Sequence, residues 1–213
     1  MNALRFDPVA VRAAYEASVG AFLDLCRSLA PADWEKPALE GWNVRLLVGH
    51  TSRSLTTVRD YLAAGAKEPV ELQHAFDYLP AVLEQFAGAD SAALAARARA
   101  AAEGMGPEPL PWLRQLAQEV LAQVRATPDG APLTTLVGSM RLVDYLPTRV
   151  FELVVHSADL ALATGQRYRP APQACLIAWT VAAAAAAAAP EPMPALLALT
   201  GRGPLPEGFS VVP

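Results

Sequence analysis

The sequence predicts an all-α protein, a bundle of several helices joined by short or moderate links. About a fifth of the 213 residues are alanine, the best helix former, and isoleucine occurs only at Ile177. The 19 prolines, which interrupt helix interiors, divide the chain into apolar segments of helical spacing. The sequence shows neither an alternation of strands with helices nor a glycine-rich nucleotide-binding motif, so it does not support a Rossmann-type sheet.

Six segments between these prolines are expected as helices, and two of them have clear cap residues. They cover residues 8–29, 43–64, 81–103, 112–126, 147–165 and 172–189. Asp7 can cap the first helix, whose first turn holds a proline. Asn43 can begin the second, and Gly65 can end it. After the last helix we expect a loop-like tail with at most a short extended finish at 209–212.

Charge and hydropathy exclude two classes of partner. The net charge is −4, and lysine occurs only at Lys36 and Lys67, so no basic stripe is available to displace counterions from phosphates. The longest apolar stretch, 175–189, is shorter than the roughly 20 residues that span a bilayer. Cys26 and Cys175 lack the spacing of a redox or zinc motif and are expected as buried, inert thiols. We therefore expect a cytoplasmic protein with no nucleic-acid or membrane partner.

A stripe of ionisable residues runs along the otherwise apolar segment 149–162. At about 100° per residue, one narrow sector holds Arg149, Glu152, His156 and Asp159. A helix that is apolar around most of its circumference is a buried one, and buried charges need each other, a metal or a solvent-filled pocket. Glu152 and His156 are four residues apart, so their side chains project from adjacent turns and can chelate one cation.

A metal site needs a further ligand, because catalytic zinc usually takes three protein ligands. His50 is the better of the two remaining histidines, since it falls at the edge of the apolar face of its helix. His74 is expected in a loop or short turn and ranks below His50. The alternative is that Glu152, His156 and Asp159 form the solvent face of an amphipathic helix, and spacing alone slightly favours that interpretation.

Three segments together resemble a known family. They are WEKP at 34–37, GWNVRLLVGH at 41–50 and RVFELVVHSADL at 149–160. In this order they are similar to the mycothiol-dependent maleylpyruvate isomerase N-terminal family, part of the DinB/YfiT-like superfamily of metal-binding four-helix bundles. The resemblance implies such a bundle over residues 1–165. The remaining residues, 166–213, would add a C-terminal helix and short tail packed on the same domain.

The same resemblance implies a ligand set for a divalent metal. The matching positions are His50, Glu152 and His156, and the metal would be zinc, with nickel or another divalent ion as alternatives. Arg149 and Asp159 match flanking polar residues and would orient the ligands. Both are also the candidates for a catalytic role. The guanidinium fork of Arg149 suits a substrate carboxylate, and an ion pair with Glu152 or Asp159 is the simpler alternative.

The activity that the resemblance implies is a metal-dependent thiol S-transferase or isomerase acting on a small electrophile. Mycothiol, or a related low-molecular-weight thiol, would be the cosubstrate, deprotonated by coordination. The alternative is a non-enzymatic metal-binding bundle with a structural or oligomerisation role. Trp179 and the small residues of the last helix could form a homodimer face, although intramolecular packing suits the same pattern equally well.

Overall fold

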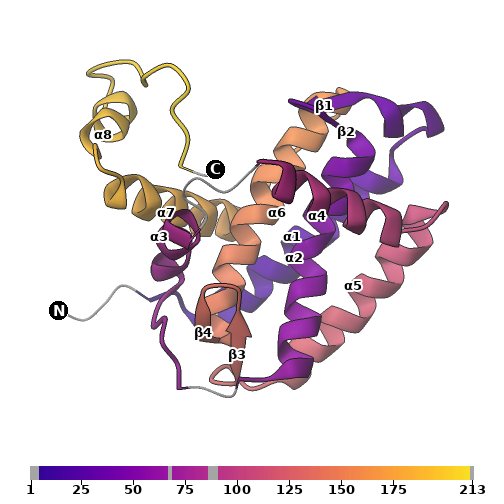
Figure 1. Ribbon diagram of the computed structural model, residues 1–213, viewed down its shortest axis with the longest axis horizontal. Coiled ribbons are helices and arrows are strands. Elements are labelled where there is room, and N and C mark those ends of the chain that lie inside the picture. The colour runs from indigo at the N-terminus through magenta and orange to yellow at the C-terminus, as the bar shows by residue number, and fades with distance from the viewer. Residues whose placement is uncertain (1–4, 67–68, 86–90, 212–213) are drawn as a thin grey trace.

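The computed structural model describes residues 5–66, 69–85 and 91–211, of which 91–94 are described by their backbone alone. Within these residues the chain is mostly helical, with two short antiparallel hairpins (Figure 1). The helices are α1 Pro8–Arg27, α2 Val44–Ala64, α3 Ala75–Gln85, α4 Ser91–Gly104, α5 Pro109–Ala126, α6 Leu142–Thr164, α7 Pro172–Ala188 and α8 Met193–Leu199. The predicted all-α class is confirmed.

Four helices form a bundle around one apolar core. Both α1 and α2 pack against α5 and α6, so the four helices close into a ring. Each contributes fully buried side chains to the centre, among them Phe22, Leu47, Leu113 and Leu153 in chain order. Outside the ring, α4 lies on α2, α3 lies on α6 and α7, and α7 lies on α1 and α6 (Figure 1). The bundle holds α2 and α6 side by side, and the candidate site residues are on these two helices.

The predicted caps are confirmed at three helix ends. Asp7 accepts a hydrogen bond from the amide nitrogen of Ala10 at 2.9 Å and begins α1. Asn43 accepts one from the amide of Leu46 at 3.0 Å and begins α2. Gly65, with φ of 67°, ends α2, and its amide donates to the carbonyl of Tyr61; glycine adopts such a positive φ without strain. Local side-chain chemistry therefore sets these boundaries.

Two prolines lie inside helices, contrary to the expectation that prolines mark helix ends. The predicted start of a helix at Pro147 is wrong, because α6 begins at Leu142. A proline within a helix costs about 3 kcal/mol. Burial of Leu142 and Leu146, both 0% exposed, offsets this cost, since a fully buried leucine contributes about 1.5–3 kcal/mol. Pro80 lies inside α3 in the same way.

The predicted helix over 81–103 is wrong in its extent. The structure has α3 and α4 as separate helices, with residues 86–90 outside the described range. α3 begins at Ala75, six residues before the predicted start. The predicted helix over 112–126 begins earlier as well, because Pro109 occupies the first turn of α5, where a missing amide proton costs nothing.

Two hairpins precede α2 and α6, and neither was predicted from the sequence. A 3-10 helix, Pro31–Glu35, leads into β1 (Pro37–Leu39) and β2 (Trp42–Asn43), which pair antiparallel. The second hairpin pairs β3 (Pro132–Thr135) with β4 (Gly138–Arg141). These strands are too short to show an alternating pattern. The first hairpin matters for function because it brings Trp42 beside the start of α2.

The chain after α7 differs from the predicted loop. It forms the short helix α8, with a proline in its first turn, and then continues without a strand through residue 211. The extended finish expected at 209–212 is therefore absent over 209–211, and residue 212 lies outside the described range. Among the described residues, no helix is long and apolar enough to cross a membrane. Lys67, one of the two lysines, lies outside the described residues.

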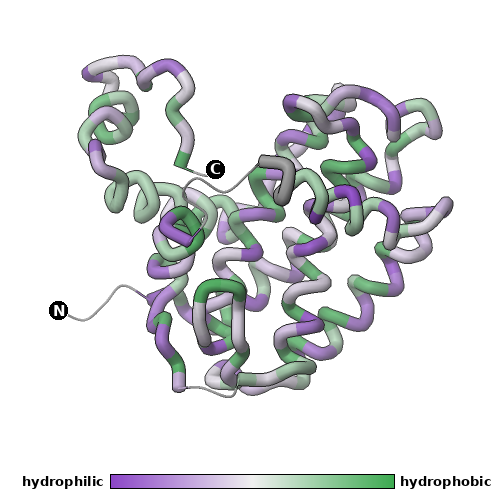
Figure 2. The backbone as a smooth tube through the Cα atoms, in the orientation of Figure 1, coloured by the Kyte–Doolittle hydropathy of each residue, from purple (hydrophilic) through white to green (hydrophobic). Residues whose placement is uncertain are grey.

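α7 is hydrophobic along its length, whereas the hydropathy of α5 alternates (Figure 2). The inner side of α7 buries Ile177 and Val181, and its outer side leaves Trp179 58% exposed. A homodimer face at Trp179 and the division of the chain after residue 165 stay predictions.

Both cysteines are free thiols. Cys26 is buried, which raises its pKa, but Cys175 is only half-buried, contrary to expectation.

Candidate metal centre

Three of the sequence-derived site residues come together where α2 packs on α6. His50 lies on α2, and Glu152 and His156 lie on α6. One ligand atom from each, an imidazole nitrogen or a carboxylate oxygen, lies within 4.8 Å of the other two. Among the described residues, this is the one group of histidine, cysteine and acidic side chains close enough to hold a metal ion.

α2 and α6 run antiparallel, and this determines which residues meet. Near the start of α2, the ring of His50 lies 4.9 Å from the ring of His156, which is near the end of α6. Three turns further along α2, the ring of Tyr61 lies 5.7 Å from that of Tyr145, near the start of α6. The four-residue spacing on α6 then places Oε2 of Glu152 at 3.3 Å from Nε2 of His156.

The imidazole of His50 is held between two rings. The indole of Trp42 from β2 meets it at 5.1 Å between centroids, and His156 meets it edge-on from the other helix. Its Nδ1 atom is buried and has no hydrogen-bond partner among the described residues, an arrangement that costs free energy unless something satisfies the nitrogen. The orphaned nitrogen and the donor set of two imidazoles and one carboxylate fit a divalent cation such as zinc.

Burial opposes the charged form of all three groups, and the neighbouring charges and hydrogen bonds determine in which direction each pKa finally shifts. Burial and the nearby His156 lower the pKa of His50 to about 4, so it is neutral at pH 7. Burial would raise the pKa of Glu152, but the hydrogen bond with His156 and the charge of Arg149 lower it. Burial would lower the pKa of His156, but hydrogen bonds to Asp159 and Glu152 raise it. Without a cation, the cluster is a neutral His50 beside a Glu152–His156 ion pair.

Asp159 lies next to the cluster and contacts one of its members. Its Oδ2 atom is 3.0 Å from Nδ1 of His156, while Nε2 of the same ring faces Glu152. A carboxylate that holds one imidazole nitrogen fixes the tautomer and the orientation of the ring. The arrangement therefore suits Asp159 to orient His156 rather than to bind an ion itself.

Arg149 is buried, with 7% of its surface exposed, and it packs on aromatic rings. Its Cζ atom lies 4.9 Å from the ring centroid of Tyr145 and 5.3 Å from that of Tyr78. Among the described residues it forms no ion pair, with Glu152, Asp159 or any other carboxylate. The ion pair with Glu152 or Asp159, the simpler of the two alternatives given for Arg149, is therefore not formed.

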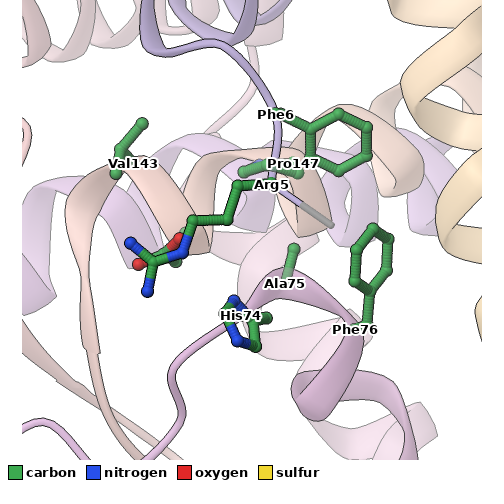
Figure 3. A pocket seen from close by; sticks show the side chains of 8 residues that line it. Arg5, Phe6, His74, Ala75, Phe76, Val143 and Pro147 are labelled. Carbon is green, nitrogen blue, oxygen red and sulfur yellow. The ribbon is translucent and has the colours of Figure 1, made fainter. Parts of the chain in front are cut away.

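His74 lies apart from the cluster. It occupies a bend just before α3, in agreement with the predicted loop or turn. It lines a small pocket together with Arg5, Phe6, Phe76 and Pro147 (Figure 3). His50, Glu152 and His156 do not line this pocket, so the pocket beside His74 is separate from the metal cluster.

Three aromatic residues of the site were not predicted from the sequence. Tyr145 is four residues before Arg149 and extends the polar stripe by one turn, so the same periodicity could have identified it. Trp42 stands within a motif that carries the resemblance, but its contact with His50 depends on the hairpin. Tyr78 reaches Arg149 from α3, and no local pattern indicates that contact.

The fold and the site define a class of protein, a helical bundle with two histidines and one carboxylate gathered between antiparallel helices. Residues 15–161 match the family model described as the mycothiol maleylpyruvate isomerase N-terminal domain. The match covers more than half of the chain, so the chain belongs to this family, as the three sequence motifs predicted. No significant match was found among curated proteins or solved structures. The family indicates a mycothiol-related, metal-dependent function of the isomerase or transferase kind.

Proposed function

We propose that the protein is a divalent-metal-dependent enzyme that uses mycothiol, or a related low-molecular-weight thiol, to transfer sulfur to a small electrophile or to isomerise it. The observation that carries the proposal is the convergence of ligand atoms from His50, Glu152 and His156 within 4.8 Å, with the buried Nδ1 of His50 left without a partner. Zinc is the proposed metal because imidazole and carboxylate ligands suit it, and nickel is the alternative.

The number of protein ligands favours chemistry over a structural role. Within the described residues the cluster offers three ligand groups. Catalytic zinc sites typically have three protein ligands and keep one position for water or substrate, whereas structural sites are closed by four. Asp159 does not supply the fourth, since its carboxylate is hydrogen-bonded to His156. This supports the enzyme over the alternative, a metal that only holds helices together.

The side chains around the cluster are suited to thiol chemistry. A divalent cation bound there would cause a coordinating thiol to lose its proton. Asp159 would orient the ring of His156, and Trp42 packs against the ring of His50. The thiolate sulfur would attack one carbon of an activated double bond, and the electron pair of that bond would move onto the conjugated electron-withdrawing group. If that group then takes up the proton that the thiol released, the carbon–sulfur bond persists and the result is transfer. If the electron pair instead returns after rotation about the former double bond and expels the thiolate, the result is isomerisation.

Metal content tests the ligand set directly. Wild-type protein should hold about one zinc or similar ion per chain, and His156→Ala should lose it, because two remaining ligands rarely suffice. His74→Ala is the matched control, since this histidine lies outside the cluster and should leave the metal content unchanged. Full metal occupancy in His156→Ala would reject these ligands.

X-ray absorption spectroscopy of the zinc-loaded protein separates the enzyme from the structural alternative. The proposal predicts nitrogen and oxygen ligands alone in the free protein and one added sulfur ligand when N-acetylcysteine is supplied. It also predicts thiol-dependent turnover of an electrophile. A site closed by four protein ligands, unchanged by the thiol, would support the structural role instead.

A further inference from the structure

Two arginines near the cluster have no carboxylate partner within the part of the chain that the structure describes. Arg149 of α6 is buried, and Arg53 of α2 is half-buried, three residues after His50. Within the described residues neither takes part in an ion pair, although seven other cationic side chains do. Removing a charge from water without pairing it is costly, so Arg149 in particular needs an explanation.

The surroundings of Arg149 orient its guanidinium, and the charge of Glu152 acts on it, but no carboxylate of the described residues forms an ion pair with it. Its Nε atom donates to Oγ1 of Thr148 at 3.0 Å, and this is the one hydrogen bond of its side chain among the described residues. The rings of Tyr145 and Tyr78 pack against it at 4.9 and 5.3 Å. Tyr145 is itself fixed by a hydrogen bond from its hydroxyl to Oγ1 of Thr57 at 2.9 Å. The terminal nitrogens of a rigidly placed guanidinium are thus left for another acceptor.

The position of Arg149 links it to the metal cluster. It is three residues before Glu152, which corresponds to about 4.5 Å along the helix axis. The positive charges of Arg53 and Arg149 both act on His50 and help to keep that ring neutral. A ligand held by Arg149 would therefore lie within one or two turns of α6 from the cluster.

We propose that Arg149, assisted by the charge of Arg53 on the neighbouring helix α2, is the anchor for a carboxylate group of the electrophilic substrate. The planar guanidinium fork matches a carboxylate with two parallel hydrogen bonds, and the bound anion would supply the directly paired carboxylate that Arg149 does not have among the described residues. Arg149 is then the residue that selects anionic electrophiles over neutral ones. The assignment of the anion to the substrate rests on the proposed function, whereas the anion site itself does not.

Binding of crotonate, a small unsaturated carboxylate, tests the site without any thiol. Isothermal titration of the wild-type protein, in both zinc-loaded and zinc-free forms, should show saturable crotonate binding at least about tenfold tighter than binding of the neutral analogue crotonamide. This comparison needs no variant. Equal affinity for the two compounds would overturn the proposal.

Variants locate the anion. Arg149→Met keeps much of the side-chain volume without the charge, and it should weaken crotonate binding at least about tenfold, while Arg149→Lys should lose less. Arg59→Met is the matched control, because Arg59 lies on α2 and pairs at the surface with Asp60. Crotonate binding that is unchanged in Arg149→Met but lost on zinc removal would place the carboxylate on the metal and overturn the proposal.

The thiol is the other source of a carboxylate, and a separate comparison distinguishes it. N-acetylcysteine carries a carboxylate that N-acetylcysteamine lacks. If Arg149→Met abolishes a preference for the first thiol but leaves crotonate binding intact, the anion belongs to the thiol and the proposal is wrong. Crotonate binding is also measured in zinc-free protein. A protein that binds crotonate through Arg149 but shows no metal-dependent turnover would therefore contradict the proposed function and still support the anion site.

Discussion

The Nδ1 atom of His156 lies 3.0 Å from Oδ2 of Asp159, three residues further along α6. This contact occupies one ring nitrogen and directs the other, Nε2, toward Oε2 of Glu152 at 3.3 Å. A metal-binding histidine needs one nitrogen free of its proton, and a carboxylate on the opposite nitrogen selects that tautomer. We therefore predict that Asp159 positions the ring of His156 for a metal ion.

Asp159→Asn should weaken zinc binding by about 10–100-fold, the range found when a group that orients a metal ligand is lost. A neutral amide does not hold the Nδ1 proton as a carboxylate does, so the ring is no longer fixed with Nε2 toward the cluster. Competition with a chromophoric chelator measures the affinity. Asp60→Asn is the control, since Asp60 is exposed and pairs only with Arg59. Equal zinc affinities in wild type and Asp159→Asn would contradict this role.

Zinc binding should release about one proton per ion between pH 6 and 8. In the metal-free protein the pKa of His156 is raised, so its ring is protonated in this range and must lose that proton to bind a metal. The pKa of His50 is about 4 and that of Glu152 is lowered, so neither releases a proton there. The apparent affinity should therefore rise with pH, by about tenfold per unit, until His156 is neutral.

Calorimetry in buffers of different ionisation enthalpy measures this proton count. In Asp159→Asn one of the two carboxylates that raise the pKa of His156 is removed, so the affinity should level off at a lower pH than in wild type. Release of two protons would mean that His50 is also charged in the metal-free protein, and release of none would mean that His156 is already neutral.

Gly49→Ala should destabilise the protein by about 1–3 kcal/mol, the usual cost of forcing extra volume into a packed contact. A Cβ atom at this position would lie 2.6 Å from the backbone nitrogen of Ala102 on α4 and 2.7 Å from its Cα. Since backbone atoms cannot turn aside, α4 has to shift. Gly20→Ala on α1 is the matched control, because nothing lies within 4 Å of its new Cβ. It should stabilise the helix by about 0.5–1 kcal/mol.

Denaturant unfolding of the metal-free protein measures both free energies. Gly49 precedes His50, so Gly49→Ala should also lower zinc affinity, which Gly20→Ala should not. Equal unfolding free energies for the two variants would show that the contact between α2 and α4 is looser than the structure has it.

Asn43→Ala should lower the free energy of unfolding by about 1 kcal/mol, the typical cost of losing an N-cap. The Asn43 side chain accepts a hydrogen bond from the amide of Leu46 and donates one to Oε2 of Glu35 at 2.9 Å. Asn43→Ser should retain most of the stability because serine caps equally well. Asn43→Asp should fall between the two, since its carboxylate caps the helix but repels Glu35. An alanine variant as stable as wild type would show that the cap contributes nothing.

Much of the site could be predicted from α6 alone. The separation of Glu152 and His156 by four residues dictates that they share a helix face, and Asp159 follows on the same face, because helical geometry acts over a few residues. The resemblance added His50 to this pair. Spacing alone slightly favoured a solvent-facing stripe, and the packing of α2 on α6 decides against it by half-burying Glu152 and His156.

The sequence determines helices α1, α2 and α7 and the caps at Asp7, Asn43 and Gly65, because apolar periodicity and capping residues act within one or two turns of themselves. It does not determine the separation of α3 from α4, the start of α6 at Leu142 or the helix α8. Only the tertiary structure decides that Trp42 packs on His50, that Tyr78 packs on Arg149 and that no carboxylate of the described residues forms an ion pair with that arginine. These contacts join segments far apart in the chain, where no local pattern exists to reveal them. They depend on which helices the apolar core brings together, and that is a property of the whole bundle.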